Sequence, residues 1–385
     1  MRHNKDSWWR RNWATVVVLT LIVGLLAALW AYARPEPENG PLPAEYAEYE
    51  NGRVIQILTD HCEADPVAEG AHRGQQTLLV EVTSGRYKGT SLMVSNTVGP
   101  VYGEPAQVGQ SVTLIINTYA NGDLTATVYE YNRAPAVYII LALFVLTAVL
   151  VGGKTGAKSV LGLVMTVAML FLVLMPMLMK GWAPIPTTFF LCALVAVACF
   201  VILGGCSRKV ACACLGTVAG MGLAMVFGLL AQKMLHLDGL RAADAEALLQ
   251  LRQTGTPLGI RGLLVSGVII SALGAVMDVA MSVSSAMQEL KAVNPRLGPK
   301  DLWKSGMNIG RDMVGTMTNT LILAILGSGM VLILYLYSLG LDWNQLMSSS
   351  YLGIEIISGV SSAIGVILAV PVTALVSALV YGRQK

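Results

Sequence analysis

The sequence predicts an α-helical polytopic membrane protein of about eight transmembrane helices, with a small all-β domain (an OB-like barrel or sandwich) between the first and second helices. Three observations predict this fold. The chain of 385 residues is 55% hydrophobic and only 13% charged, whereas soluble proteins carry about a quarter charged residues. Apolar runs of about twenty residues, the length that crosses a bilayer, recur along the chain. One region, 53–133, instead has short β-branched runs separated by turn residues.

Residues 1–33 combine a basic flank with the first apolar run. Arginine, lysine and interleaved tryptophans precede the run, which is typical of a cytoplasmic segment with interfacial anchors. The run itself, 14–33, ends in Ala31-Tyr32-Ala33, a small-x-small pattern that signal peptidase can cleave. Because the run is longer than the usual apolar region of a signal peptide, we expect an uncleaved signal anchor. Cleavage after Ala33 is the alternative.

An extended linker and an all-β domain follow. Proline, glycine and glutamate fill residues 34–52 without an apolar period, which indicates a linker. The β domain is predicted at 53–133, with strands at 53–59, 76–83, 90–95, 111–117 and 124–131. Five strands at this spacing favour a small barrel or sandwich of the OB type. The domain lacks a basic face with interleaved aromatic residues, so we predict no nucleic-acid partner.

The membrane domain is predicted at 134–385. We place its spans at 136–151, 160–179, 185–205, 210–231, 261–290, 316–339 and 353–381. Lysine and arginine gather in alternate connectors, as the positive-inside rule requires of cytoplasmic ones. Both termini are therefore predicted in the cytoplasm and residues 34–135 outside it. An amphipathic helix, Leu240–Arg252, is predicted in an outer connector because acids come early in it and arginine late.

A lone carboxylate, Asp278, lies inside an apolar run of membrane-spanning length. A charge is costly in hydrocarbon, so such a residue usually faces a partner or a watery cavity. Ser282 and Ser285 follow Asp278, and hydroxyl groups there can form hydrogen bonds between helices. A buried carboxylate without a partner can take up and release a proton. Asp278 is therefore the first candidate for an ion or solute path, and a purely structural role is the alternative.

A polar block precedes the span at 316–339. Arg311 and Asp312 belong to it, and Asn319 lies about two turns further on. If Arg311 extends toward the inner surface while Asn319 enters the bundle, a polar track runs from the cytoplasm toward Asp278. The alternative is an interfacial Arg–Asp anchor and a hydrogen bond of Asn319 between helices, each stabilising the packing by about 1 kcal/mol or less.

Glu355, at the head of the last span, is a second acid in a membrane context. Both it and Asp278 precede the letters Val-Ser-Ser-Ala by five residues, and both helices are predicted to run from outside to inside. This pattern would suit an internal repeat of parallel type, or it is a short coincidence. Pro371 in the same span removes one backbone hydrogen bond. We expect a kink there, with a broken helix that exposes carbonyl groups as the alternative.

Two segments read GAVMDVAMSVSSAMQEL (Gly274–Leu290) and GRDMVGTMTNTLILA (Gly310–Ala324). They resemble the signature stretches of the YibE/F family of bacterial multispanning membrane proteins. The order of parts, with an N-terminal span, an outer domain and a membrane bundle, also fits the family over nearly the whole chain. The resemblance implies a multi-pass protein of the bacterial plasma membrane and suggests a permease. It names no substrate.

The sequence contains no motif of a conventional enzyme. GxSxG and HExxH are absent, and Gly152-Gly153-Lys154-Thr155 lacks the glycine spacing of a Walker A motif. The six cysteines form no disulfide framework and have no zinc-site spacing. We therefore expect no cofactor and no metal.

The leading functional hypothesis is a non-enzymatic secondary permease or exporter in the lipid bilayer, driven by a proton or cation gradient. Its polar path for a small solute or ion would be lined by Asp278, Ser282, Ser285, Asn319, Glu355, Arg311 and Asp312. A second hypothesis is a non-catalytic membrane assembly or envelope-interaction protein that binds a protein partner through its outer β domain. A third is an intramembrane hydrolase that pairs Asp278 with Asp312 or Glu355. No residue pattern identifies the solute.

Overall fold

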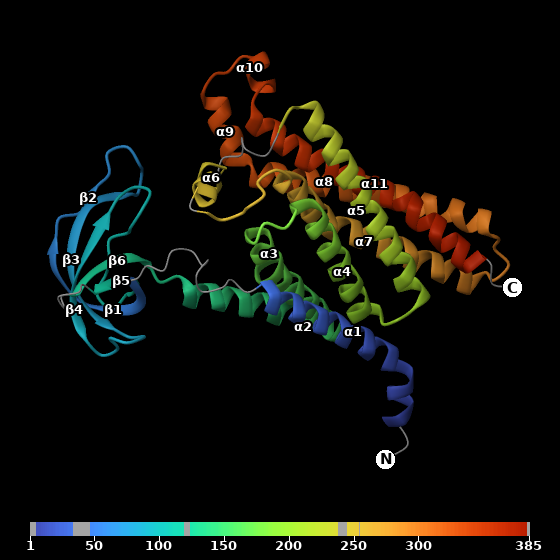
Figure 1. Cartoon of the computed structure of the whole chain (residues 1–385), viewed down its shortest axis with the longest axis horizontal. Coiled ribbons are helices and arrows are strands. Elements are labelled where there is room, and N and C mark those ends of the chain that lie inside the picture. The colour runs from blue at the N-terminus through green and yellow to red at the C-terminus, as the bar shows by residue number, and fades with distance from the viewer. Residues whose placement is uncertain (1–4, 34–46, 119–123, 238–244, 254, 383–385) are drawn as a thin grey trace. The chain divides into compact units, whose positions relative to one another are not determined.

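The chain divides into two compact units. The computed structural model describes residues 5–33, 47–118, 124–237, 245–253 and 255–382. The barrel unit, residues 37–150, holds the strands and the start of helix α2, and the helical unit, residues 1–36 with 151–385, holds the other helices (Figure 1).

Within the described residues the barrel unit has six strands. They are β1 (Ala47–Asp60), β2 (Glu63–Ala64), β3 (His72–Val82), β4 (Ser91–Val98), β5 (Ser111–Thr118) and β6 (Leu124–Tyr131). Burial alternates along them, so that Val112, Leu114 and Ile116 of β5 point into the core. The five predicted strands are all present, and β2 is an addition. β1 also takes in 47–52, which was predicted as linker, while 34–46 lie outside the described residues.

The strands close into a barrel. The sheet order is β1-β5-β6-β4-β3, and β3 pairs with β1 again, so the sheet returns to its first strand. These pairs are antiparallel except for β4 with β6, which is parallel. Without the short β2, which only pairs with β3, this is a five-stranded barrel with the strand order of the OB type. The barrel alternative of the sequence prediction is confirmed.

A buried polar cluster fixes the loop between β4 and β5. Gln76 is 1% exposed, and its Oε1 accepts hydrogen bonds from Ala106 N at 2.8 Å and Asn96 Nδ2 at 3.0 Å. Asn96 also donates to the carbonyl of Glu104 at 3.0 Å. Gln76 Nε2 donates to Asp60 Oδ2 at 2.9 Å, and this hydrogen bond lowers the pKa of the Asp60 carboxyl. The loop is thus held by hydrogen bonds from inside the barrel.

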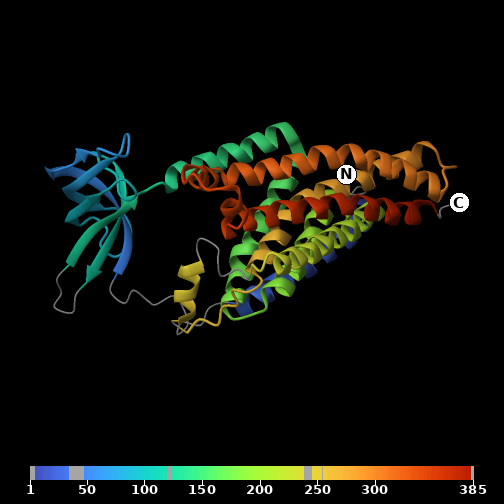
Figure 2. The same cartoon turned by 90° about the horizontal axis from the view of Figure 1, so that it is seen from above.

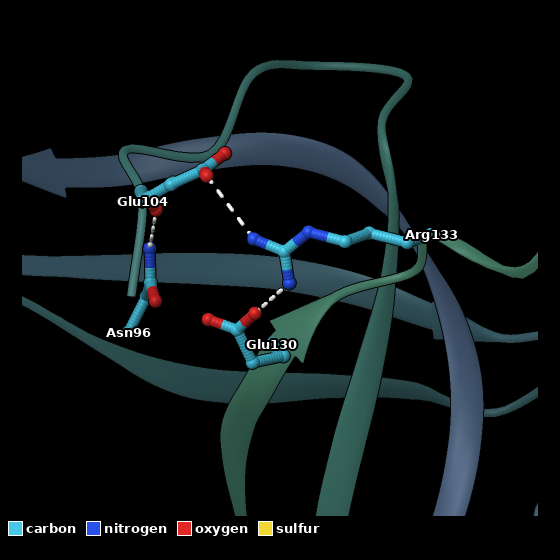
Figure 3. Close-up of polar contacts among 4 residues, drawn as sticks. All are labelled: Asn96, Glu104, Glu130 and Arg133. Atoms are coloured by element: carbon cyan, nitrogen blue, oxygen red, sulfur yellow. Dashed lines mark hydrogen bonds and ion pairs between the residues drawn. The ribbon is translucent and has the colours of Figure 1, made fainter. Parts of the chain in front are cut away.

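Arg133 joins the barrel to helix α2 (Ala134–Met169). Its guanidinium forms ion pairs with Glu130 of β6 and with Glu104, whose carboxylate is 3.2 Å away (Figure 3). Figure 3 also shows the Asn96 amide at the main chain of Glu104. The last strand therefore passes directly into the helix, and the first part of α2 belongs to the barrel unit.

Several other helices are long and apolar enough to cross a membrane. In the described chain these are α1 (Lys5–Ala33), α4 (Pro184–Gly204), α5 (Arg208–Met234), α7 (Leu263–Val293), α11 (Ser350–Gly382) and the segment Ala134–Met179, which contains α2, the π-helix η1 (Leu170–Leu174) and α3 (Met175–Met179). The bent pair α8 (Pro299–Ser328) and α9 (Met330–Ser338) makes a seventh if it is one span.

The predicted count of eight spans is not confirmed. The predicted spans 136–151 and 160–179 both fall in the one segment Ala134–Met179. Gly153, with φ 54° and ψ −134°, interrupts the helical geometry between them. Only a residue without a Cβ adopts this conformation easily.

Two short helices lie in connectors, α6 (Ala245–Gln253) and α10 (Trp343–Met347). α6 covers most of the amphipathic helix predicted at Leu240–Arg252, of which 240–244 lie outside the described residues. Glu246 is in its first turn and Arg252 in its last, the charge order that the helix dipole favours.

The helical unit packs around α11. This helix contacts α5, α7 and α8, and Figures 1 and 2 show the four lying side by side. α5 comes close because glycines face the contact: a Cβ on Gly216 would lie 2.0 Å from Thr373 Oγ1, and one on Gly365 would lie 2.7 Å from the Ala224 Cβ. Small residues permit such approach between membrane helices. The contact between α5 and α11 therefore leaves no room for a solute.

The Gln76 cluster gives a prediction for barrel stability. Gln76→Leu should destabilise the barrel by about 2–4 kcal/mol, because Asn96 Nδ2 and Ala106 N each lose a hydrogen-bond acceptor in a buried site. Gln75 is exposed and its side chain donates only to Ser95, so Gln75→Leu should change stability by about 0.5 kcal/mol or less. Pulse proteolysis of the full-length protein in increasing urea measures the stability of both variants. Equal resistance of the Gln76→Leu and Gln75→Leu variants to proteolysis would contradict this role of the cluster.

Candidate functional site

Close contacts at glycine set the register between α5, α7 and α11. A Cβ on Gly220 of α5 would lie 2.8 Å from side-chain atoms of both Val276 in α7 and Ala369 in α11. Val276 and Ala369 therefore share one level of the helical unit. Asp278 comes two residues after Val276, so it lies about 3 Å from that level along the axis.

Helix α8 brings Arg311 and Asp312 to the same level. A Cβ on Gly310 would lie 2.1 Å from Cγ1 of Val370, the residue that follows Ala369. Arg311 and Asp312 come next in α8. Measured along the helix axes, Asp278, Arg311 and Asp312 therefore lie within about 5 Å of one another.

All three ionisable residues are exposed. Asp278 is exposed while Val276 and Val279 beside it are buried, and Arg311 and Asp312 are both exposed. None of the three side chains makes a hydrogen bond or an ion pair with another described residue. The ion pairs found among the described residues are those of Arg133 in the barrel unit. A charge that faces hydrocarbon costs about 2.5–3.5 kcal/mol at the bilayer centre. These exposed charges therefore need water or a covering partner.

The exposed side of α8 continues as a polar face. We define the polar face as Asn308, Arg311, Asp312, Thr316, Asn319 and Thr320, all of them exposed. Residues three and four apart lie on one side of a helix. The sequence hypothesis placed Asn319 inside the bundle. The structure places it on the exposed side, because Met313 and Met317 occupy the side of α8 that packs on the core with α11.

The serines after Asp278 have different surroundings from those expected. Ser282 is exposed and Ser285 is half-buried, and in the described chain neither side chain forms a hydrogen bond. The contacts between helices come from other hydroxyl groups: Ser284 donates to a main-chain carbonyl of α5 at 2.9 Å, and Ser271 lies 2.6 Å from Ser362 of α11. Sequence analysis did not single out the Ser271 and Ser362 pair, because only the register of α7 and α11 brings the two together.

Glu355 does not join Asp278. Ser271 of α7 meets Ser362 of α11, and the contacts of α5 show that α7 and α11 run parallel. Asp278 follows Ser271 whereas Glu355 precedes Ser362, so the two acids lie about 20 Å apart along the axes. The similar sequences around Asp278 and Glu355 therefore lie at different positions along the helix axes. Of the two acids considered as partners of Asp278 in a hydrolase, Asp312 shares its level and Glu355 does not.

Glu355 instead lies at the bend between α8 and α9. The two helices meet at 60°, and a Cβ on Gly329, between them, would lie 3.5 Å from Cδ of Glu355. A cavity of about 140 Å³ lies there, lined by apolar residues of α8, α9 and α11, with Glu355 as its ionisable residue. Within the described residues the Glu355 carboxylate makes no hydrogen bond or ion pair.

The sequence predicted a kink at Pro371, with a broken helix as the alternative, and α11 is not broken there. α11 is one helix through Pro371, and Thr373 Oγ1 donates to the carbonyl of Ala369 at 2.7 Å. The break lies at Gly329 in the preceding span, after Gly327 and Ser328. Two glycines around a serine are a common cause of a sharp bend, and this signal is visible in the sequence.

The level shared by Asp278, Arg311 and Asp312 offers two carboxylates and one guanidinium. Such groups inside membrane proteins bind ions or relay protons. Among the described residues, no three or more of histidine, cysteine, aspartate and glutamate gather closely enough to hold a metal ion.

The comparisons with known proteins bear on the helical unit. A family model described as YibE/F-like protein matches residues 140–383. The match covers nearly all of the predicted membrane domain and includes α7, α8 and α11, which carry the candidate residues. No curated protein and no solved structure gives a significant match to the chain.

The register of α8 can be tested by two glycine substitutions. Gly310→Ala places a methyl group 2.1 Å from Val370 Cγ1 and should destabilise the helical unit by about 1–3 kcal/mol. Gly315→Ala meets nothing within 4 Å, and it should leave stability unchanged or raise it by about 0.5–1 kcal/mol through helix propensity. Thermal unfolding of the detergent-purified variants compares them. Equal melting temperatures would show that α8 and α11 meet elsewhere.

Proposed function

Because this chain belongs to the YibE/F-like protein family, we propose that it is a multispanning permease or exporter that moves a small solute or ion along a polar path centred on Asp278. The observation that carries the proposal is the level shared by Asp278, Arg311 and Asp312 on the exposed sides of two apolar helices. Ionisable residues within membrane helices commonly mark pathways for substrates, ions or protons. A gradient of protons or cations would supply the energy.

The proposed path follows the polar face of α8. Asn319 lies about 12 Å along the axis from Arg311, and Gly329, where Glu355 meets α8, lies about 15 Å further. Ser282 and Ser285 of α7 extend the polar surface around Asp278. The whole length, about 27 Å, is close to the roughly 30 Å thickness of the hydrocarbon core. A path of this length would cross most of the bilayer.

We further propose eight spans. The segment Ala134–Met179 would be about 69 Å long if straight, more than twice the hydrocarbon core of roughly 30 Å. We infer that it crosses the membrane twice, with a turn at Gly153. Lys154 and Lys158 then lie in a cytoplasmic connector. In this topology both termini are cytoplasmic, α1 is an uncleaved signal anchor, and the barrel lies outside a bacterial plasma membrane.

A second candidate function is assembly with an envelope protein through the barrel. The observation that favours it is an outward apolar strip, in which Leu79 of β3 pairs in register with Met93 of β4, beside Ile55 of β1. Met93 is 69% exposed, and exposed apolar patches often mark binding surfaces. Under this alternative, Asp278 would matter for packing and not for a solute.

Asp278→Asn should abolish ligand binding and leave the fold intact, since Asp278 loses no contact within the described chain. A thermal-shift screen of the detergent-purified protein against pH, cations, anions and small metabolites measures this, because a ligand at 100 times its Kd stabilises the folded state by about 2.7 kcal/mol. At least one solute class should stabilise the wild type and not the variant.

Asp301→Asn is the matched control for this screen. It makes the same chemical change in the first turn of α8, about 15 Å along the axis from Arg311, so it should respond as the wild type does. If no solute stabilises any of the proteins, or if all three respond alike, Asp278 is not a binding residue and the assembly function is favoured.

A further inference from the structure

The cavity at the bend between α8 and α9 combines an apolar lining with one carboxylate. Apart from Glu355, its lining consists of isoleucine, leucine, valine and glycine residues. Its volume of about 140 Å³ is close to that of an engineered apolar cavity of about 150 Å³ that binds benzene. The cavity therefore accepts one aromatic ring or a short branched alkyl group.

The Glu355 carboxylate is available to a ligand. It has no hydrogen-bond or ion-pair partner in the described chain, and Gly329 lies beside it at the bend. A Cβ on Gly329 would lie 3.5 Å from Cδ and 3.7 Å from Oε2 of Glu355. A longer side chain at this position would fill the space beside the carboxylate. The glycine thus permits the bend and leaves the carboxylate uncovered.

The chemistry of the lining selects one class of ligand. A carboxylate attracts a cation, and at an effective dielectric constant of 20 two unit charges 4 Å apart attract each other by about 4 kcal/mol before desolvation. A metal ion such as Ca²⁺ takes six to eight oxygen ligands, whereas only Glu355 offers a side-chain oxygen here. An organic ammonium group bound to an apolar body satisfies both the carboxylate and the lining.

The cavity opens on the side of the helical unit. Leu326, Ile356 and Val360 line it and are 47%, 44% and 41% exposed. Since α8 and α11 have the hydropathy of membrane spans, this side faces the bilayer or its interface. Amphiphilic cations accumulate there, because their apolar part leaves water.

We propose that this cavity binds apolar organic cations, with the ammonium group at Glu355 and the hydrocarbon part among Ile325, Leu326 and Ile356. Such cations are then the substrate class of the permease, and this last step rests on the proposed function. Binding itself rests on the cavity and its carboxylate alone.

Calorimetric titration of the full-length protein in nanodiscs tests the site with three single-ring probes of similar size. At pH 7 benzylamine is a cation, benzyl alcohol is neutral and benzoate is an anion. The wild type should bind the benzylammonium ion at least about tenfold more tightly than benzyl alcohol, and benzoate most weakly. Glu355→Gln, which keeps the shape and removes the charge, should erase the difference between the cation and the alcohol.

Two further variants control for general damage. Glu289→Gln removes an exposed carboxylate near the end of α7, outside the cavity, and should bind all probes as the wild type does. Gly359→Val adds a side chain to the cavity lining, where a Cβ comes no closer than 3.7 Å to a neighbour. This variant should bind the benzylammonium ion and benzyl alcohol more weakly than the wild type, and to the same extent.

The proposal is overturned if Glu355→Gln retains the preference for the cation, or if the wild type binds benzyl alcohol or benzoate as tightly. The outcome is separate from that of the proposed function. Charge-dependent binding at Glu355 without any solute response that depends on Asp278 would support the site and remove the permease. A solute response that depends on Asp278, without charge-dependent binding at Glu355, would support the permease and remove the Glu355 site.

Discussion

The cost of an uncovered charge in hydrocarbon governs this membrane domain. Asp278, Arg311 and Asp312 lie at one level of the helical unit, are all exposed, and form no hydrogen bond or ion pair within the described chain. A charge that faces hydrocarbon costs up to about 2.5–3.5 kcal/mol, the value at the bilayer centre, which is a large part of the 5–15 kcal/mol by which proteins are usually stable. These exposed charges must therefore meet water or a covering surface.

Close packing elsewhere in the unit makes this constraint sharper. Glycines let α5 approach α11 until little space is left between them, and the described buried residues of α7 and α11 include serine and threonine but no charged residue. The charged side chains Arg311 and Asp312 lie instead on the exposed side of α8. The bend at Gly329 then places Glu355 near the far end of α8, beside a cavity.

Sequence alone predicted the elements well and their juxtaposition poorly. Alternating burial is a local property, so the strand at 111–117 was recognisable, and a run such as 185–205 shows its membrane length directly. The shared level of Asp278 and Arg311 depends on which residues meet across two helices, and the fit of Gly310 against Val370 sets this only in three dimensions. The sequence also drew attention to Pro371, where α11 continues as one helix, and not to Gly329, where the structure has its bend.

The accessibility of the polar face to water within a bilayer is the most direct measure of the central claim. Single cysteines at Asn319 and at Val226, which is apolar and 49% exposed on α5, away from the proposed path, would be introduced into a variant whose native cysteines are serine. A charged, membrane-impermeant thiol reagent would then be added to proteoliposomes. A water-lined path predicts that the Asn319→Cys variant reacts and the Val226→Cys variant does not. An unreactive Asn319→Cys variant, or equal reaction of both, would contradict it.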